Sequence, residues 1–511
     1  MFLLGKHWQQ ELRRRISRGV EWRELAEAIV SRAHELRETE LPIKWEEGRK
    51  VLLPTARNLA FRSQSFVIAH ALTGDLSFLR SMLSDGLKAA SLKDWNPEHF
   101  LDTAEMAFAV ACIRCWAKPV STRNQIRELE ETLHERAVKR GLWSLTGGSA
   151  WTKKPGNWNV VCNASLMVVA EALSGTYPDE CSDLLTRAKL SSKVGLNALG
   201  PGGEWEEGVV YLDHSAQFAW FAQQVTGSGH FQPFFHSNAF RTAMTGSSGM
   251  IADFGDDLPD CALPAIGPTG ATPAGTSPLH LLWGSEAEHI SNRFMGRTVA
   301  CLRSSRSFLA VKFGVVRHLH SHADVGSFVW EANGDRLVCD PGRLRYDLPG
   351  YFDPASRFKI SGALETAHNC VSFPDTPQDS RTWTRAELDG NALIVSIMFD
   401  TARILERRFL TGTDGSLTIF DKLLKSADEK GQALWTCHFR GEPLGNNIWR
   451  GLEGQCFKAT FPIPDDDQVL VRDFSDKALS ERCSLDPISR IQFPLPLKQL
   501  EKGIQTQFKP I

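Results

Sequence analysis

The stretch Asp253–Pro278, DFGDDLPDCALPAIGPTGATPAGTSP, divides the sequence into two parts with different hydrophobic periods. Glycine and proline recur through it, and both interrupt helices, because proline lacks an amide hydrogen and glycine leaves the backbone unrestricted. From Val20 to about Gln224, apolar residues recur at helical spacing, whereas strand-like apolar runs follow the stretch. Helices followed by strands, without alternation, predict an α-helical domain and then a β-sandwich.

Local signals support the helical reading of the first part. Asp102–Glu105, DTAE, resembles a capping box ahead of an apolar run, which predicts a helix that starts there. Three helices are expected to end at a glycine, because glycine adopts the left-handed C-cap conformation without strain. These glycines are Gly74, Gly175 and Gly227. An apolar stripe at helical spacing, formed by Leu25, Ile29, Ala33 and Leu36, predicts a further helix.

In the second part, Arg297–Gly314 and Asn391–Asp400 are strand-like, and Thr413–Gly415 is a hairpin turn signal. The chain of 511 residues is too long for one ordinary core, which stops growing near ~250–300 residues. The boundary is expected near residues 280–295, which gives a helical domain over residues 1–285 and an antiparallel β-sandwich over 286–511.

Composition narrows the function classes. The net charge of −2 excludes a broadly basic nucleic-acid binder. No segment approaches the about 18 continuous apolar residues of a membrane span, and the apolar run in Met1–His7 is short for a signal peptide. The sequence as written therefore predicts a cytoplasmic protein, or a periplasmic or secreted one if the N-terminus is incomplete. Its 11 scattered cysteines are interpreted as free thiols.

One segment is rich in histidine. Arg317–Asp324, RHLHSHAD, holds three histidines and an aspartate; in an extended segment His318, His320 and His322 point to one face. Of two such neighbouring histidines, one can bind a metal ion and the other can transfer protons. A solvated, histidine-rich loop without either role is the alternative interpretation. With Asp340 of an Asp-Pro-Gly turn and His368, His322 makes a credible zinc set, but sequence spacing does not force these residues together.

Two further clusters precede the glycine- and proline-rich stretch. In Asn157–Asn163, NWNVVCN, Asn159 and Asn163 share a helix face, and their amides could bind a substrate carboxylate; Asn157 or Asn159 could equally cap a helix. In Gly202–His214, GGEWEEGVVYLDH, Tyr211 could act as a general acid and base, or be a packed core tyrosine.

The order of these clusters, with Thr366–Asn369 after them, resembles the heparinase II/III-like polysaccharide lyases, a family that includes oligoalginate lyases. His320–Gly342 carries the most specific part, a His-x-His-x-Asp segment followed by a strand and Asp-Pro-Gly. The resemblance spans about residues 150–374. It implies an incomplete (α/α) toroid followed by an antiparallel β-sandwich, with the active site in the cleft between them.

The resemblance also implies β-elimination at a uronic acid of an acidic polysaccharide or oligosaccharide. Tyr211 and His320 then handle protons across an interdomain cleft, and Asn163 or Asn159 neutralises the substrate carboxylate. One structural zinc ion would be held by His322, Asp340 and His368. The expected substrate-binding residues are Asn159, Trp205, His214 and Arg345, of which His214 stands where many relatives have a second tyrosine.

Two alternatives stay open. A glycoside hydrolase would use a pair of carboxylates, and Glu206, Glu207 and Asp213 lie close together in the sequence. A glycan-binding or assembly protein would keep the fold without the reaction. The endo or exo mode of action and the oligomeric state have no signature in the sequence.

Overall fold

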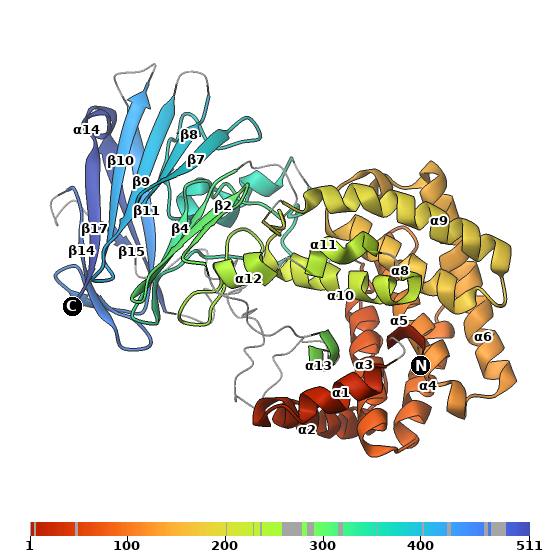
Figure 1. Cartoon of the computed structure of the whole chain (residues 1–511). Coiled ribbons are helices and arrows are strands. Elements are labelled where there is room, and N and C mark those ends of the chain that lie inside the picture. Colours follow the sequence, from red (N-terminus) through yellow and green to blue (C-terminus); the bar gives the residue numbers. More distant parts are fainter. Residues whose placement is uncertain are drawn as a thin grey trace. The chain divides into compact units, whose positions relative to one another are not determined.

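The computed structural model describes residues 2–4, 7–45, 50–200, 202–227, 229–235, 238–257, 278, 280–283, 291–314, 320–353, 355–400, 403–426, 431–463, 469–471 and 487–511. Of the sequence features above, His318 and residues 258–277 lie outside these ranges. Helices fill the N-terminal part and antiparallel sheets the C-terminal part (Figure 1). None of the described helices combines the length and apolarity that crossing a bilayer requires.

The chain forms two compact units. The first unit comprises Met1–Leu199, Leu212–His236 and Pro264–Glu286. The second comprises Gly200–Tyr211, Ser237–Leu263 and Ala287–Ile511, so it takes two segments from the part of the sequence that precedes the expected boundary. One reason is visible at Glu204, whose buried carboxylate accepts hydrogen bonds from the amides of Arg297 and Thr298 in the second unit.

The first unit is built from helices that pack on one another. Its central helices, α5 and α8, are mostly apolar and are almost completely buried, as expected for core helices. α3 packs on α5, α5 on α8, and α8 on α9. The helices are α1 (Trp8–Ile16), α2 (Val20–Arg37), α3 (Leu53–Thr73), α4 (Ser77–Ala90), α5 (Phe100–Trp116), α6 (Arg123–Leu133), α7 (Lys139–Trp143), α8 (Asn157–Leu173), α9 (Pro178–Gly195), α10 (Val209–Thr226), α11 (Gln232–Phe235) and α13 (His280–Trp283); α10 starts in the second unit.

The helix-end predictions hold in part. Gly74 and Gly227 have positive φ angles of 77° and 59° directly after α3 and α10, as predicted. Gly175 is not in the left-handed region, because α8 ends at Leu173 with Ser174 as its C-cap. The capping-box interpretation of Asp102–Glu105 is wrong: α5 begins at Phe100, and both carboxylates lie inside the helix, where other elements use them.

The second unit contains two antiparallel sheets. One has the order β1-β2-β3-β4-β5-β11-β16-β15, with β6 beside β11, and the other has the order β12-β13-β14-β17-β10-β9-β8-β7. The strands are β1 (Arg293–Met295), β2 (Val299–Arg303), β3 (Ser307–Lys312), β4 (Phe328–Ala332), β5 (Asp335–Val338), β6 (Val371–Ser372), β7 (Trp383–Asp389), β8 (Ala392–Met398), β9 (Ile404–Thr411), β10 (Leu417–Lys425), β11 (Gln432–Arg440), β12 (Glu442–Gly445), β13 (Ile448–Arg450), β14 (Cys456–Thr460), β15 (Val469–Val471), β16 (Ile488–Pro496) and β17 (Ile504–Pro510). The short helices α12 (Asn238–Met244) and α14 (Leu497–Lys502) complete the unit.

The two sheets share one hydrophobic core. Inward-facing side chains of both sheets form a single buried cluster, in which Phe328 of β4 packs on Phe409 of β9 with ring centroids 5.5 Å apart. Along β9, exposure alternates with burial, which is the pattern of a strand with one face on a core. The predicted hairpin is confirmed, since Thr413–Gly415 connects β9 to β10 and Gly415 has a φ angle of 88°.

A buried ion pair ties the loops that precede β4 and β6 to the second sheet. Arg407 of β9 pairs with Asp421 of β10 at 2.7 Å, and its Nη1 donates to the carbonyl oxygens of Gly326 and Asn369, both at 2.7 Å. Both side chains are almost fully buried. This one guanidinium therefore fixes the loops that carry Asp324 and His368.

We expect Arg407→Met to lower the free energy of unfolding by about 3–5 kcal/mol, because it leaves the buried Asp421 carboxylate without its cation. The matched control is Arg408→Met, since Arg408 forms an exposed ion pair with Asp389. That change should cost about 0–1 kcal/mol. Urea unfolding followed by circular dichroism measures both, and equal losses would contradict the role given to Arg407.

Candidate functional site

The carboxylate of Asp256, which is fully buried, is the centre of a polar cluster in the second unit. Its Oδ2 lies 2.7 Å from Nδ1 of His320, and its Oδ1 accepts hydrogen bonds from the Tyr351 hydroxyl and, at 3.1 Å, from Arg357. Burial alone would raise the pKa of Asp256, but the hydrogen bonds of His320 and His322 and the charge of Arg357 outweigh it and hold that pKa well below its usual range. Asp256 is therefore ionised and holds His320 with Nδ1–H toward it.

The backbone brings the two loops of this cluster into direct contact. The Asp256 amide donates to the His320 carbonyl oxygen at 3.1 Å, and the Gly255 amide donates to the Asp324 carboxylate at 3.0 Å. Gly255 has a φ angle of 59°, and a Cβ atom there would lie 2.6 Å from the His320 oxygen. Only glycine satisfies both conditions, so Gly255 is a structural requirement of the contact between the two loops.

Tyr211 contacts His320 within the same unit. Its position follows from Asp257, whose carboxylate accepts hydrogen bonds, each 3.0 Å long, from the amides of Val209 and Val210 at the start of α10. The Tyr211 and His320 rings have centroids 4.1 Å apart. The expectation that these two residues come from different domains is wrong, because Gly200–Tyr211 folds with the sheets.

Three of the four tyrosines in the chain lie in this cluster. The hydroxyls of Tyr211 and Tyr346 are hydrogen-bonded to each other, and the rings of Tyr346 and Tyr351 are 5.5 Å apart. Burial, together with the Asp256 charge, raises the pKa of Tyr346 well above its usual value, so Tyr346 keeps its proton. Sequence analysis missed Tyr346 and Tyr351; the signal that could have found them is the scarcity of tyrosine.

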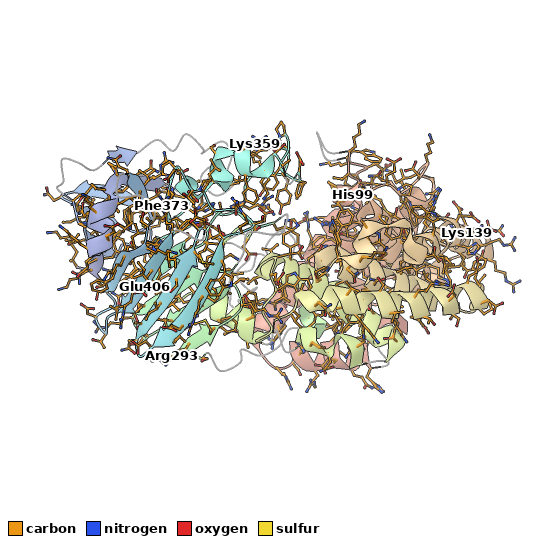
Figure 2. All side chains as sticks on the ribbon, turned by 90° about the horizontal axis from the view of Figure 1, so that it is seen from above. His99, Lys139, Arg293, Lys359, Phe373 and Glu406 are labelled. Atoms are coloured by element: carbon orange, nitrogen blue, oxygen red, sulfur yellow. The ribbon has the colours of Figure 1, made fainter. Side chains whose placement is uncertain are left out.

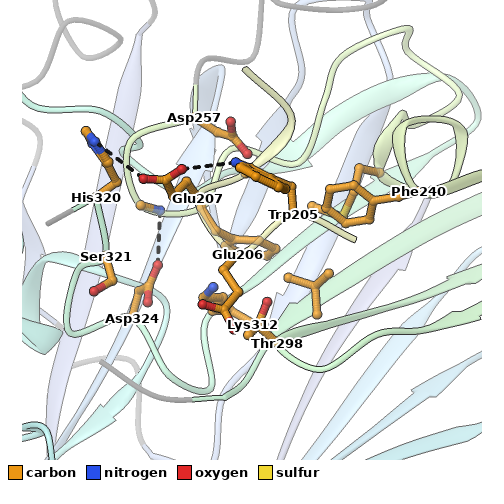
Figure 3. A pocket seen from close by; sticks show the side chains of 15 residues that line it. Trp205, Glu206, Glu207, Phe240, Asp257, Thr298, Lys312, His320, Ser321 and Asp324 are labelled. Atoms are coloured by element: carbon orange, nitrogen blue, oxygen red, sulfur yellow. Dashed lines mark hydrogen bonds and ion pairs between the residues drawn. The ribbon is translucent and has the colours of Figure 1, made fainter. Parts of the chain in front are cut away.

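Nε2 of His320 faces a pocket that carries acidic side chains (Figure 3). It lies 4.0 Å from Oε1 of Glu207, and the other Glu207 oxygen accepts a hydrogen bond of 3.1 Å from the indole of Trp205. Trp205 lines this pocket, and its side chain is almost completely buried, with 1% of its surface exposed. Glu206 and Lys312 line the same pocket, and burial raises the pKa of Glu206.

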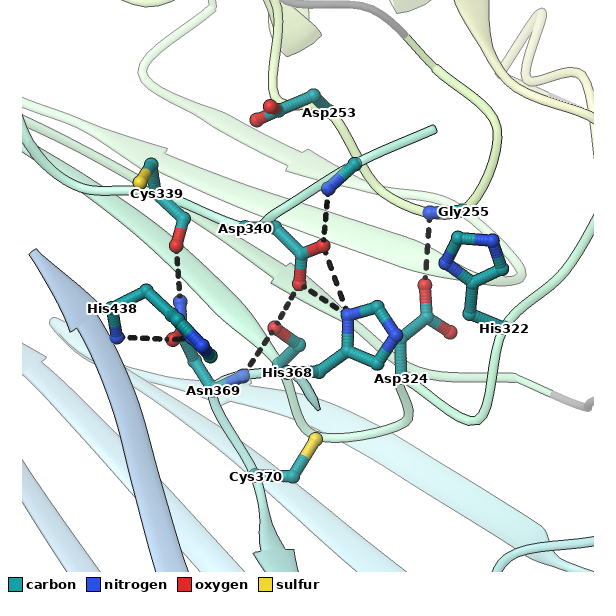
Figure 4. A network of polar contacts seen from close by, with 12 residues as sticks. Asp253, Gly255, His322, Asp324, Cys339, Asp340, His368, Asn369, Cys370 and His438 are labelled. Carbon is teal, nitrogen blue, oxygen red and sulfur yellow. Dashed lines mark hydrogen bonds and ion pairs between the residues drawn. The ribbon is translucent and has the colours of Figure 1, made fainter. Parts of the chain in front are cut away.

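The expected zinc ligands lie close together but are joined by hydrogen bonds. Nδ1 of His368 is 3.0 Å from both Asp340 carboxylate oxygens, and the His322 and His368 rings have centroids 5.1 Å apart (Figure 4). Nδ1 of His322 and Nε2 of His368 are buried without a hydrogen-bond partner in the described part of the chain. Within that part, no three histidine, cysteine, aspartate or glutamate side chains are arranged to hold a metal ion.

The charges of this group follow from their surroundings. Burial lowers the pKa of His322 and outweighs its hydrogen bond to Asp256. For His368, the Asp340 charge outweighs burial and raises the pKa, and for Asp340 the same pairing lowers it. His322 is therefore a neutral imidazole, which is the form that binds a metal ion, and His368 and Asp340 form an ion pair.

The two expected carboxylate-binding asparagines lie in the first unit and are buried. The Asn163 amide donates to Asn159 and, at 3.1 Å, to the hydroxyl of Ser191 on α9. Oδ1 of Asn159 accepts from the Gly195 amide at 3.1 Å. In this arrangement they join α8 to α9, and a direct contact of either side chain with substrate stays a prediction.

Two other expected substrate-binding residues are partly exposed. Arg345, in the second unit, is 52% exposed and pairs with Asp347, its Nε lying 3.1 Å from that carboxylate. His214, on the part of α10 that belongs to the first unit, is 20% exposed and lies 2.9 Å from the buried carboxylate of Glu105. Both residues can therefore contact solvent.

The lowered pKa of Asp256 predicts how the free energy of unfolding changes at acid pH. Its pKa in the folded state lies below the value of about 3.9 in an unfolded chain, so the folded state binds fewer protons near that pH. The stabilisation is thus present above about pH 4 and is lost as the pH falls through the folded-state pKa. Asp256→Asn removes this contribution, so the difference in unfolding free energy between wild type and variant should shrink from about pH 7 to about pH 3. Urea titrations across this range measure it, and a constant difference would refute the ionised state of Asp256.

Comparison with solved structures identifies the fold. The chain resembles a crystal structure of heparinase III with a TM-score of 0.64 at 11% sequence identity, over 90% of this chain and 77% of the other. It also resembles another heparinase III structure (TM-score 0.62, 13% identity, 90% and 78% covered) and a heparan sulfate lyase, HepC, from Pedobacter heparinus (TM-score 0.57, 12% identity, 95% and 88% covered). No protein-family model and no curated protein sequence matches the chain. The chain therefore has a heparinase II/III-like fold.

Proposed function

From this heparinase II/III-like fold, we propose that the protein is a polysaccharide lyase that cleaves a uronic-acid-containing glycan by β-elimination. The observation that carries the proposal is the contact of Tyr211 with His320, in which Tyr346 bonds the Tyr211 hydroxyl and Asp256 bonds the His320 imidazole. An acidic glycosaminoglycan is the substrate class that agrees with the heparinase III and heparan sulfate lyase neighbours. The finer architecture we propose for the helical unit is an incomplete (α/α) toroid.

The reaction requires two proton transfers on adjacent carbons of one sugar ring. A base removes the proton from C5, electrons of that bond form the C4–C5 double bond, and the C4–oxygen bond breaks. We assign the base to Nε2 of His320, because Asp256 occupies its Nδ1–H and leaves Nε2 toward the pocket. Tyr211 gives its proton to the departing C4 oxygen, and Tyr346 stabilises the resulting phenolate by donating a hydrogen bond.

Neutralising the C6 carboxylate is the other electrostatic task, since C5–H is not acidic while that carboxylate keeps its full charge. Asn163 remains the residue predicted for it from the sequence, and Arg345 is an exposed cation in the unit that holds Tyr211 and His320. Arg345 suits the task because a guanidinium binds a carboxylate through two parallel hydrogen bonds.

Activity is tested by incubating the protein with a panel of uronic-acid polysaccharides. Elimination creates an unsaturated uronate that absorbs in the ultraviolet, whereas a hydrolase that uses Glu206 and Glu207 would produce reducing ends without that absorbance. A binding protein would produce neither. Absence of the ultraviolet product on every member of the panel would count against the lyase.

Tyr211→Phe should lower the rate by about 10²-fold or more, because it removes only the hydroxyl that acts as general acid. Tyr177→Phe is the matched control, since Tyr177 is the one tyrosine outside the cluster and stacks on His134 in the first unit. It should retain wild-type activity. Near-full activity of Tyr211→Phe, measured on a substrate that the wild type cleaves, would show that another group transfers the proton.

We also propose one structural zinc ion, held by His322, Asp340 and His368. Support comes from the donor chemistry: two neighbouring buried imidazoles have a nitrogen without a hydrogen-bond partner among the described residues, and a carboxylate lies against one of them. Zinc bound here would take the place of the proton that pairs His368 with Asp340, so its binding would release a proton, and it would stiffen the loops around His320.

Metal analysis of protein purified without chelator should find about one zinc ion per chain. His368→Ala should remove it. His438→Ala is the control, because His438 is equally buried and bonds Asn369 beside His368 but is not among the proposed ligands. Wild-type protein without metal, or zinc retained by His368→Ala, would refute the site.

A further inference from the structure

Two carboxylates on α5 in the helical unit lie one turn apart, and both are buried. Asp102 is 0% and Glu105 is 2% exposed, and their spacing of three residues puts them on one face of the helix. Neither is required by the proton transfers assigned above. A buried carboxylate is stable only with partners, so these partners define what this face of α5 does.

Glu105 holds two nitrogen-bearing side chains from neighbouring helices. Arg57 of α3 binds it through Nε at 3.0 Å and Nη2 at 3.1 Å, and Nε2 of His214 on α10 lies 2.9 Å from it. Arg57 and His214 contact the same oxygen, Oε1, so they lie side by side. Burial opposes ionisation of Glu105, but the charges and hydrogen bonds of Arg57 and His214 outweigh it and lower the pKa of Glu105 to about 2.

A third nitrogen-bearing side chain, that of His99, lies beside Asp102 but forms no hydrogen bond with it. Oδ2 of Asp102 accepts hydrogen bonds from the Leu52 amide at 2.7 Å and from the Asn96 amide group at 2.6 Å, while Oδ1 lies 3.1 Å from Nδ1 of His99. The His99 ring packs edge-on against Trp158 at the start of α8, with centroids 4.7 Å apart. His99 lies in the helical unit (Figure 2).

The nitrogen-bearing side chains of this group are partly exposed, whereas the carboxylates beside them are buried. Arg57, His214 and His99 are 49%, 20% and 21% exposed, whereas the side chains of their carboxylate partners are at most 3% exposed. The acceptors thus lie beneath the surface, and the partly exposed side chains of this face are the nitrogen-bearing ones that the carboxylates position. Donors that are already oriented bind an anion with less loss of side-chain freedom.

We propose that Arg57 and His214 form a subsite that binds an anionic group, a carboxylate or a sulfate, of an acidic sugar. Trp158 and His99 are the flanking surface for the neighbouring sugar ring, and Glu105 is a positioning residue that acts through the side chains it holds. The substrate class rests on the proposed lyase function; the subsite itself rests on the donor arrangement in the helical unit.

The test measures binding without turnover, in the full-length Tyr211→Phe background. Isothermal titration uses two probes, a heparan sulfate hexasaccharide and the unsulfated hexasaccharide with the same backbone. In that background, Arg57→Gln and His214→Gln should each raise Kd by about 10-fold or more, as expected for losing a charge-assisted contact. Arg57→Lys should restore part of the affinity. An effect on both probes identifies the sugar carboxylate as the ligand, and an effect on the sulfated probe alone identifies sulfate.

The matched control is Arg187→Gln, because Arg187 on α9 is also partly exposed and pairs with a carboxylate, that of Asp183. It should leave Kd unchanged. If Arg57→Gln does not fold, His99→Gln is the second variant, since Asp102 keeps its Leu52 and Asn96 partners there, and Kd should rise about 3-fold. Folded variants that bind like the parent, or a parent that binds neither probe, would overturn the subsite. Binding by the Tyr211→Phe parent, together with no unsaturated product from the wild-type protein on the same probes, would instead overturn the lyase and leave the subsite standing.

Discussion

The ionised carboxylate of Asp256 is the constraint on which the candidate site depends. A charge in a fully buried position is tolerated only when donors surround it, and here two imidazoles, a phenol and a guanidinium converge on two oxygen atoms. These donors come from the loops that follow residue 320 and from the segment 351–357. Satisfying one carboxylate therefore assembles side chains that are far apart in the sequence.

The same constraint orders the proton chemistry. Because Asp256 occupies Nδ1 of His320, the tautomer and the ring orientation are fixed before any substrate binds. Tyr351 is held as a neutral donor, since burial and the Asp256 charge raise its pKa well above its usual value. The site is thus pre-organised by burial and hydrogen bonding, which is the arrangement that lowers the reorganisation needed in a transition state.

The sequence predicted those features that depend on local patterns. The change of hydrophobic period separated helices from strands, and Thr413–Gly415 located a hairpin, because turn chemistry and side-chain alternation are local. Tyr211 and His320 were singled out as members of local clusters, and a family resemblance then implied their roles. Asp256, Tyr346 and Arg357 were missed because no local spacing relates them, and only the folded chain brings them together. Asp102 and Glu105 have the spacing of a capping box, but their side chains accept hydrogen bonds from Leu52 and from Arg57 of α3 instead.

The second unit is discontinuous in sequence, and this affects when it can fold during synthesis of the chain. Gly200–Tyr211 and Ser237–Leu263 leave the exit tunnel before the strands with which they fold have been synthesised. Glu204 and Asp256 then have to remain hydrated until residues 297–357 emerge and provide their partners. Folding of this unit is for that reason largely post-translational. In a nascent chain stopped near residue 290, the acidic side chains of these two segments would still be without the partners that the later residues provide.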